Sequence, residues 1–181
     1  MNCLVIPTYP PHFLYLKKLL ESIDKYNLDK NKTNIYICIN KNDSYQLSKT
    51  IFNNFKSIII NILFLENIIF DLFKISNSEN IIKNCDKFSF QSLKKILSVK
   101  YITSYLKYDF VYVLDSEGLF IRPFSINSIF IEYFKNKRIF YNSKQRLHYI
   151  QSILSKNILN TDIPVPGWLL ENYLWIYEKN I

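Results

Sequence analysis

The sequence has 181 residues, of which 49% are hydrophobic and 17% aromatic, so it can bury a substantial core and is not a disordered chain. Its formal net charge is +8, which either reflects amino-acid usage rich in Ile, Asn, Lys and Tyr or favours an anionic partner. The lysines are scattered and accompany no nucleic-acid-binding motif, so a basic nucleic-acid-binding protein is only a minor alternative.

The cysteines and the apolar segments indicate where such a chain works. Cys3, Cys38 and Cys85 show no CxxC spacing, which predicts free thiols in a reducing compartment rather than a zinc site. The N-terminus has no basic region, and Pro7 cuts its apolar run short, so it does not read as a signal peptide. The longest apolar stretch contains Glu66 and Asp71, which makes a membrane span costly. We therefore expect a cytoplasmic protein, with possible association at the inner face of a membrane.

Apolar runs alternate with helix-like segments along the first two thirds of the chain. Strands are predicted at 3–7, 34–40, 57–65 and 109–115, and helices at 12–26, 44–55 and 88–106. The segment 76–84 is polar and poorly patterned. Continuous apolar strands separated by helices predict an α/β protein with a Rossmann-like, mostly parallel sheet covered by helices on both faces.

Beyond residue 124 the pattern is less regular. A helix is predicted from 125, a strand at 138–142, a helix at 144–156 and a further helix after a tight turn at Gly167. No internal repeat or low-complexity linker divides the chain. The sequence therefore predicts one domain over 1–181, with 1–124 as the ligand-binding part and 125–181 as an incomplete second part that ends within a helix.

Glycine is scarce, and this limits the possible phosphate sites. Only Gly118 and Gly167 are present, so the sequence has neither a GxGxxG fingerprint nor a GxxxxGK[ST] loop. A phosphate group would have to be held by a metal ion or by lysines. In parallel sheets ligands bind outside the carboxyl ends of the strands, which here carry Thr8, Asp43 and Asp115.

The motif Asp115-Ser116-Glu117-Gly118 follows the central apolar run. On an extended segment, side chains two apart point the same way, so Asp115 and Glu117 are expected to converge on one ligand while Ser116 turns aside. Two carboxylates suit Mg²⁺ or Mn²⁺, whose other positions water and diphosphate oxygens can fill. Gly118 would supply a positive φ or room for a ligand. The same four residues are also good turn formers, so a simple turn is the alternative interpretation.

The stretches PTYPPHFLYLKKLLESI, SFQSLKKILSVKYI and YDFVYVLDSEGLFIRPF together resemble a GT-A glycosyltransferase of an uncharacterised bacterial and viral branch. The resemblance covers about 2–124 and is loose beyond it. The motif here is Asp-Ser-Glu rather than the Asp-x-Asp of the family. The resemblance implies sugar transfer from a nucleotide-diphosphate sugar, with a UDP-sugar favoured and Mn²⁺ or Mg²⁺ as cofactor.

The resemblance also assigns residues to the donor site. It places Asp115 and Glu117 at the metal and Asp115 and Ser116 at the donor. The other residues that it assigns to the donor are Pro7, Thr8, Tyr9, Asp43, Gln91 and Lys94. Lys94 would offset the charge of the leaving diphosphate, although Lys95 competes for this role and the sequence does not say which of the two faces inward. His12 stands where relatives often have an acidic residue, and an ordinary surface histidine is the alternative.

The acceptor side is assigned from the C-terminal part. Trp168 would offer a sugar-stacking face and Glu171 a catalytic base, with Asp162 as the other candidate base. The simpler alternatives are a core tryptophan and a glutamate that favours the first turn of a helix.

The leading interpretation is a metal-dependent glycosyltransferase, a hexosyltransferase by class, that acts on a glycan or lipid-linked acceptor in capsule or lipopolysaccharide assembly. The alternative is a non-catalytic nucleotide-sugar-binding remnant.

Overall fold

The protein is described by a computed structural model that covers residues 1–29, 33–51, 55, 58–84, 87–136, 141–142, 168–169 and 175–178. It divides into two compact units, Met1–Ile131 with Leu174–Ile181 and Glu132–Tyr173. The first unit contains the main sheet, and the second contains the short antiparallel pair β5 (Tyr141–Asn142) and β6 (Trp168–Leu169). The single-domain organisation expected from the sequence stays a prediction.

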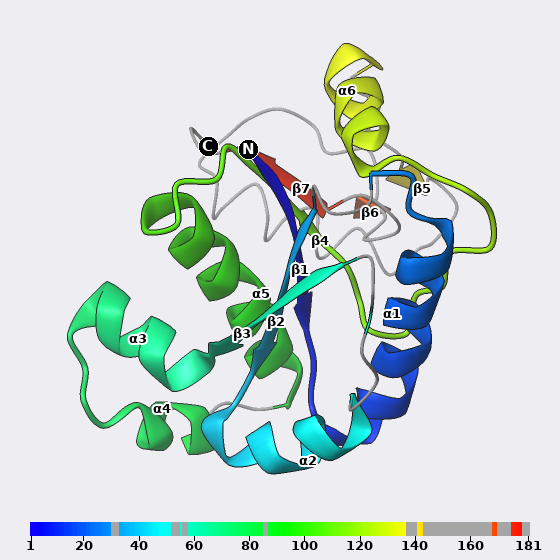
Figure 1. Ribbon diagram of the computed structural model, residues 1–181. Helices are drawn as coiled ribbons and strands as arrows, with labels where there is room; N and C mark the ends of the chain where they lie inside the picture. Colours follow the sequence, from blue (N-terminus) through cyan, green and yellow to red (C-terminus); the bar gives the residue numbers. More distant parts are fainter. Residues whose placement is uncertain are drawn as a thin grey trace. The chain divides into compact units, whose positions relative to one another are not determined.

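The main sheet has five strands in the order β3-β2-β1-β4-β7 (Figure 1). These strands are β1 (Asn2–Pro7), β2 (Asn34–Ile39), β3 (Ile59–Phe64), β4 (Phe110–Val113) and β7 (Trp175–Glu178). The first four pair in parallel, and β7 pairs with β4 in antiparallel orientation. The predicted α/β fold with a mostly parallel sheet is confirmed.

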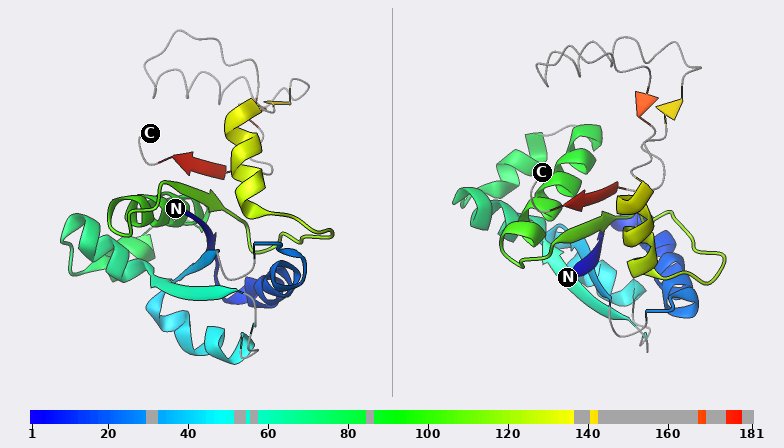
Figure 2. Two further views of the ribbon diagram at one scale, coloured as in Figure 1. Left: turned by 45° about the horizontal axis from the view of Figure 1, so that its top comes forward. Right: turned by 90° about the horizontal axis from the view of Figure 1, so that it is seen from above.

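Helices cover both faces of this sheet. On one side lie α3 (Leu65–Phe73) and α5 (Lys87–Ser104), and on the other lies α1 (Phe13–Tyr26), which contacts α2 (Ser44–Thr50) (Figures 1 and 2). Helix α1 buries Phe13, Leu16, Leu19, Leu20 and Ile23, which recur at helical spacing and form one apolar stripe. Two short 3₁₀ turns, η1 (Pro10–His12) and η2 (Lys41–Asp43), follow β1 and β2 directly.

Along the described residues, the chain departs from the predicted elements at several points. The segment predicted to lack pattern contains α4 (Ser78–Asn84), because Ile81 and Ile82 pack against a cluster formed with α3 and α5. The predicted strand 57–65 ends at Phe64, and α3 begins at Leu65. In contrast, helix α6 (Ile126–Asn136) agrees with the helix predicted from residue 125.

A further difference concerns the C-terminal part. The helix predicted after Gly167 is wrong over the described residues, because Trp168–Leu169 and Trp175–Glu178 are strands. The end of the chain lies outside the described residues. Strand β7 satisfies the free edge of β4 along Phe110–Val113. That pairing joins residues more than sixty positions apart, so local periodicity did not reveal it. The helix predicted at 144–156 lies outside the described residues.

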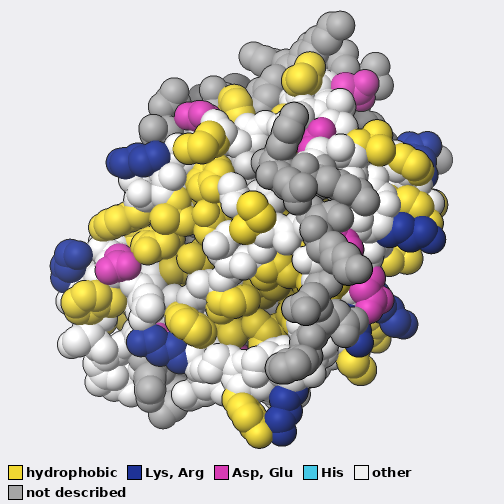
Figure 3. All heavy atoms as spheres, viewed as in Figure 1, with side chains coloured by type: hydrophobic (Ala, Val, Ile, Leu, Met, Phe, Trp, Pro, Cys, Tyr) yellow, Lys and Arg dark blue, Asp and Glu magenta, His cyan; other side chains and the backbone are white. Residues whose placement is uncertain are grey.

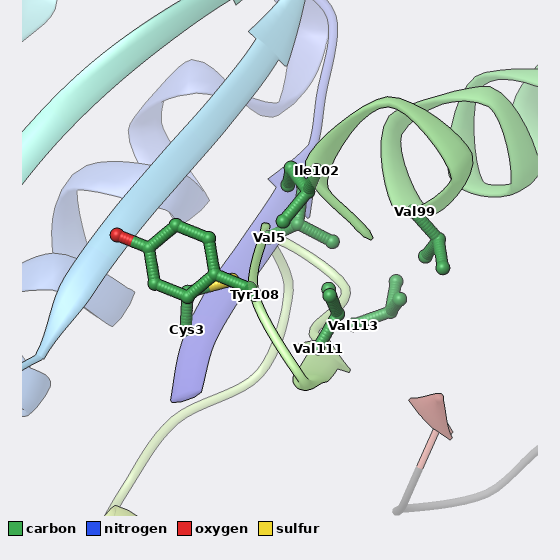
Figure 4. Close-up of a cluster of buried hydrophobic side chains, with 7 residues drawn as sticks. All are labelled: Cys3, Val5, Val99, Ile102, Tyr108, Val111 and Val113. Atoms are coloured by element: carbon green, nitrogen blue, oxygen red, sulfur yellow. The ribbon is translucent and has the colours of Figure 1, made fainter. Parts of the chain in front are cut away.

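A buried cluster fixes β1 against β4 and α5. It consists of Cys3, Val5, Val99, Ile102, Tyr108, Val111 and Val113 (Figure 4). Ile102 and Val111 are fully buried, and the thiols of Cys3 and Cys38 are buried and free, as predicted. Cys85 lies outside the described residues. This packing holds the carboxyl ends of β1 and β4 in one place.

The edge of the sheet at β3 has exposed hydrophobic side chains. Hydrophobic side chains gather on the face of the molecule where β3 and α3 lie (Figure 3), and Ile59, Ile62, Phe70 and Phe73 are exposed there. Within the described part of the chain, no helix is both long and apolar enough to span a bilayer.

Candidate functional site

The order of the strands reverses at β1 and β4, whose carboxyl ends lie side by side. The chain runs from β1 outward to β2 and β3, whereas β4 lies on the other side of β1. The loops that leave two such strands diverge, and ligands of doubly wound sheets bind between them. Here β1 is followed by Thr8, Tyr9 and η1, and β4 is followed by the Asp115–Gly118 segment. The two strands stay in register up to this point, since the Leu114 amide donates to the Val5 carbonyl at 2.9 Å.

The Asp115–Gly118 segment is a tight turn. Strand β4 ends at Val113, and the Gly118 amide donates to the Asp115 carbonyl at 3.0 Å. The expectation of an extended segment with Asp115 and Glu117 in line is therefore wrong. A Cβ at Gly118 would lie 3.2 Å from the Asp115 carbonyl oxygen, so the close approach within the turn, and not a positive φ, favours glycine. Ser116 is buried, whereas Asp115 and Glu117 are exposed.

Each carboxylate of this turn contacts a side-chain nitrogen from a different element. Lys95 Nζ of α5 lies 2.8 Å from Asp115 Oδ1. His12 Nδ1, at the end of η1, lies 2.9 Å from Glu117 Oε1. The other ring nitrogen of His12 is 2.6 Å from the Tyr9 hydroxyl, and the two rings lie 4.1 Å apart. The loop after β1, helix α5 and the turn after β4 are thus joined by side-chain contacts.

Lys94 points elsewhere. Its side chain is 3% exposed, and Nζ donates to the Thr8 carbonyl at 2.9 Å while it lies 4.9 Å from the ring centre of Phe90. Burial lowers the pKa of Lys94 because it removes water from the ammonium group. Successive helical residues point about 100° apart, so Lys94 reaches under the loop after β1 while Lys95 reaches the turn after β4. The two lysines therefore reach different parts of the site, Lys94 beneath the loop after β1 and Lys95 at the turn after β4.

Two further carboxylates lie at the ends of β2 and β3. Asp43 belongs to η2, and burial raises its pKa while the charge of Lys94 opposes this shift. Glu66 lies in the first turn of α3, and its two carboxylate oxygens accept the Lys41 amide at 3.1 and 3.0 Å. Sequence reasoning missed Glu66. Its signal was a carboxylate directly after a predicted strand at the ligand-binding edge.

The other residues predicted for the site differ in burial and in position. Pro7 ends β1, Thr8 is buried, and its hydroxyl oxygen has no hydrogen-bond partner among the described residues. Gln91 is exposed on α5. Asp162 and Glu171 lie outside the described residues, and of Trp168 only the strand assignment is described.

The turn offers two oxygen donors for a hard cation. Among the described residues, no three His, Cys, Asp or Glu side chains gather as a complete metal cage. An ion such as Mg²⁺ or Mn²⁺ commonly takes only one or two carboxylates, with water and substrate phosphates as its other ligands, so the donor chemistry of Asp115 and Glu117 fits. In the structure Lys95 Nζ contacts Asp115 and His12 Nδ1 contacts Glu117.

No family model matches the sequence, and no curated protein matches it. Mouse xyloside xylosyltransferase 1 in its apo form aligns with a TM-score of 0.51 at 11% identity, over 89% of this chain and 60% of that one. S. aureus TarS aligns at 0.39 with 15% identity, over 98% and 28% of the two chains. Core-mannan synthase A from Aspergillus fumigatus, in a Mn/GDP form, aligns at 0.35 with 6% identity, over 88% and 48%.

Only the first of these likenesses is close enough to define the fold. The protein spans 60% of the length of the mouse xylosyltransferase, and over that length the two share an α/β fold.

Proposed function

We propose that the protein is a metal-dependent glycosyltransferase that binds a nucleotide-diphosphate sugar at the carboxyl ends of β1 and β4. The observation that supports this most directly is the turn Asp115–Gly118. Its two exposed carboxylates lie where the strand order reverses between β1 and β4, and they contact Lys95 and His12. The shared fold with a xylosyltransferase agrees with the proposal. A UDP-sugar is the favoured donor, and a glycan or lipid-linked acceptor in surface polysaccharide assembly is the favoured second substrate.

In this proposal the groups of the site have separate tasks. Asp115 and Glu117 would hold Mn²⁺ or Mg²⁺, and the ion would stabilise negative charge on the departing diphosphate. Lys95, released from Asp115, would lie beside that diphosphate as a second source of positive charge. Tyr9 and His12 would orient Glu117 through the chain of short contacts between their side chains. Asp162 and Glu171 remain the proposed candidates for the base on the acceptor side.

Thermal unfolding with ligand tests the proposal. The protein is heated with UDP-, GDP- or CMP-sugars, with and without Mn²⁺. A ligand at a hundred times its dissociation constant adds about 2.7 kcal/mol to the free energy of unfolding, which raises Tm by roughly 5–10 °C for a chain of this size. We expect such a rise with one nucleotide class, and only when Mn²⁺ is present.

Two substitutions give the test its control. Asp115→Asn is expected to abolish the manganese-dependent rise. Asp109→Asn is the matched control, because Asp109 precedes the same strand, is similarly exposed and also forms an ion pair, with the N-terminus. No rise with any nucleotide, or an equal loss in both variants, would refute the proposed site. Donor binding without sugar transfer would leave nucleotide-sugar binding alone as the function.

A further inference from the structure

Lys94 is a buried cation that is only partly compensated. Its Nζ donates to a neutral backbone carbonyl, that of Thr8, and lies over the ring of Phe90. Among the described residues, no carboxylate oxygen forms an ion pair with it. Burial of an ammonium group without a paired carboxylate is costly. A protein that keeps such a group close to a candidate ligand site commonly uses it there.

The surroundings of Lys94 indicate what it does. Asp43 and Glu66 both interact electrostatically with Lys94. Burial raises the pKa of Asp43, the charge of Lys94 opposes this rise, and the charge of Glu66 adds to it. The lysine is thus the shared countercharge of two carboxylates that repel each other. These carboxylates follow β2 and β3, and Thr8 follows β1. One side chain of α5 therefore contacts or attracts the segments that follow three neighbouring strands.

Because Lys94 is 3% exposed, it lies beneath these segments rather than at the surface. The exposed neighbour Asp115 is reached instead by Lys95, one residue further along α5. The two lysines are thus suited to different tasks, one below the loops and one at the turn.

We propose that Lys94 is a positioning residue that fixes the loop after β1 and the η2 turn after β2, the two segments that would hold the nucleoside half of the donor, and that it does not contact the diphosphate. The inference rests on the proposed function for the identity of the ligand. It assigns the diphosphate half to Lys95, Asp115 and Glu117. Positive charge close to the diphosphate would then come from α5 through Lys95 alone.

Hydrogen exchange of the free protein tests the positioning role without any ligand. The amides of Thr8, Lys41 and Asp43 donate to Cys38, Glu66 and Asn40, so each reports on one of the segments around Lys94. In Lys94→Met these amides should exchange roughly tenfold faster, because the hydrogen bond and the shared countercharge are lost. The amide of Leu114, which donates to Val5, should keep its protection.

Lys95→Met is the matched control and should leave the Thr8, Lys41 and Asp43 amides unchanged. If Lys94→Met does not fold, Lys94→Gln replaces it, since glutamine is polar but lacks the charge and is one bond too short to hold the Thr8 carbonyl as Lys94 does. Unchanged protection of all three amides in the folded variant would overturn the inference.

A second readout separates positioning from a direct contact with phosphate. Dissociation constants for uridine, which has no phosphate, and for UDP are measured with Mn²⁺ for the wild type and both lysine variants. Lys94→Met should weaken uridine and UDP by the same factor, about tenfold, whereas Lys95→Met should weaken UDP alone. Loss of UDP affinity with normal uridine affinity in Lys94→Met would refute positioning. If the wild type binds no nucleotide, the proposed function fails, and hydrogen exchange still decides the role of Lys94.

Discussion

Glu117→Gln separates a metal ligand from a residue that merely closes a turn. The Glu117 side chain is 58% exposed and its partner His12 is 21% exposed, so their ion pair is largely solvated. Exposed pairs contribute about 0–1 kcal/mol to stability. Glutamine keeps the shape of the side chain and can still hydrogen-bond to His12. We therefore expect Tm to fall by less than about 4 °C.

The same substitution should have a much larger effect on Mn²⁺. Even groups that only orient a metal ligand cost roughly 10- to 100-fold in affinity when they are changed. Removal of one of two carboxylate ligands should therefore weaken Mn²⁺ binding in the presence of UDP by at least a factor of ten. Calorimetric titration of Mn²⁺ into the protein with saturating UDP gives this number, and circular dichroism gives Tm.

Glu21→Gln provides the control for the loss of one exposed charge, because Glu21 lies on the exposed part of α1. It should change neither quantity. The reasoning is refuted if folded Glu117→Gln binds Mn²⁺ within a factor of two of the wild type. It is also refuted if the variant loses several kcal/mol of stability, since Glu117 would then be a structural residue.

The remaining predictions concern the core beneath the site. Ile102 is fully buried between α5 and the β1–β4 pair. Ile102→Ala should therefore lower the free energy of unfolding in urea by about 2–5 kcal/mol, and Ile102→Val by about 0.5–1.5 kcal/mol. A loss below about 1 kcal/mol for alanine would contradict the packing in Figure 4. Burial raises the pKa of the Cys38 thiol from its ordinary 9.0 to about 11, so at pH 8 peptide mapping should show alkylation of Cys38 roughly a hundredfold slower than in the unfolded chain. Because the folded protein disfavours the thiolate, this contribution to stability is complete below pH 9 and is lost as the pH rises towards 11. Alkylation of Cys38 in the native protein at the unfolded rate would show that the strand is open.

Local patterns predicted the elements that carry the site, and the reason is physical. The apolar runs that end near Pro7, Ile39 and Val113 can be buried only as central strands, and the periodicity of α1 and α5 follows from one apolar face. Thr8, Asp43 and Asp115 were expected at the ligand-binding edge because parallel strands bring their carboxyl ends together. These statements depend on neighbours in sequence and on the rule for parallel sheets.

Other features depend on pairs that are distant in sequence. The contact of Lys94 with Thr8 spans 86 residues, and β7 joins β4 only because that edge of the sheet is free. Glu66 is joined to the site because it accepts the Lys41 amide, and His12 because it contacts Glu117. Sequence periodicity predicts neither contact. The sequence by itself determined the α/β class, the burial of the central strands and the presence of two carboxylates after β4. The tertiary structure alone decided that these carboxylates lie in a tight turn with separate partners. It also decided that Lys94 and Lys95 point to different parts of the site. The reason is that the order of the strands and the rotation of α5 arise only when the whole sheet is packed.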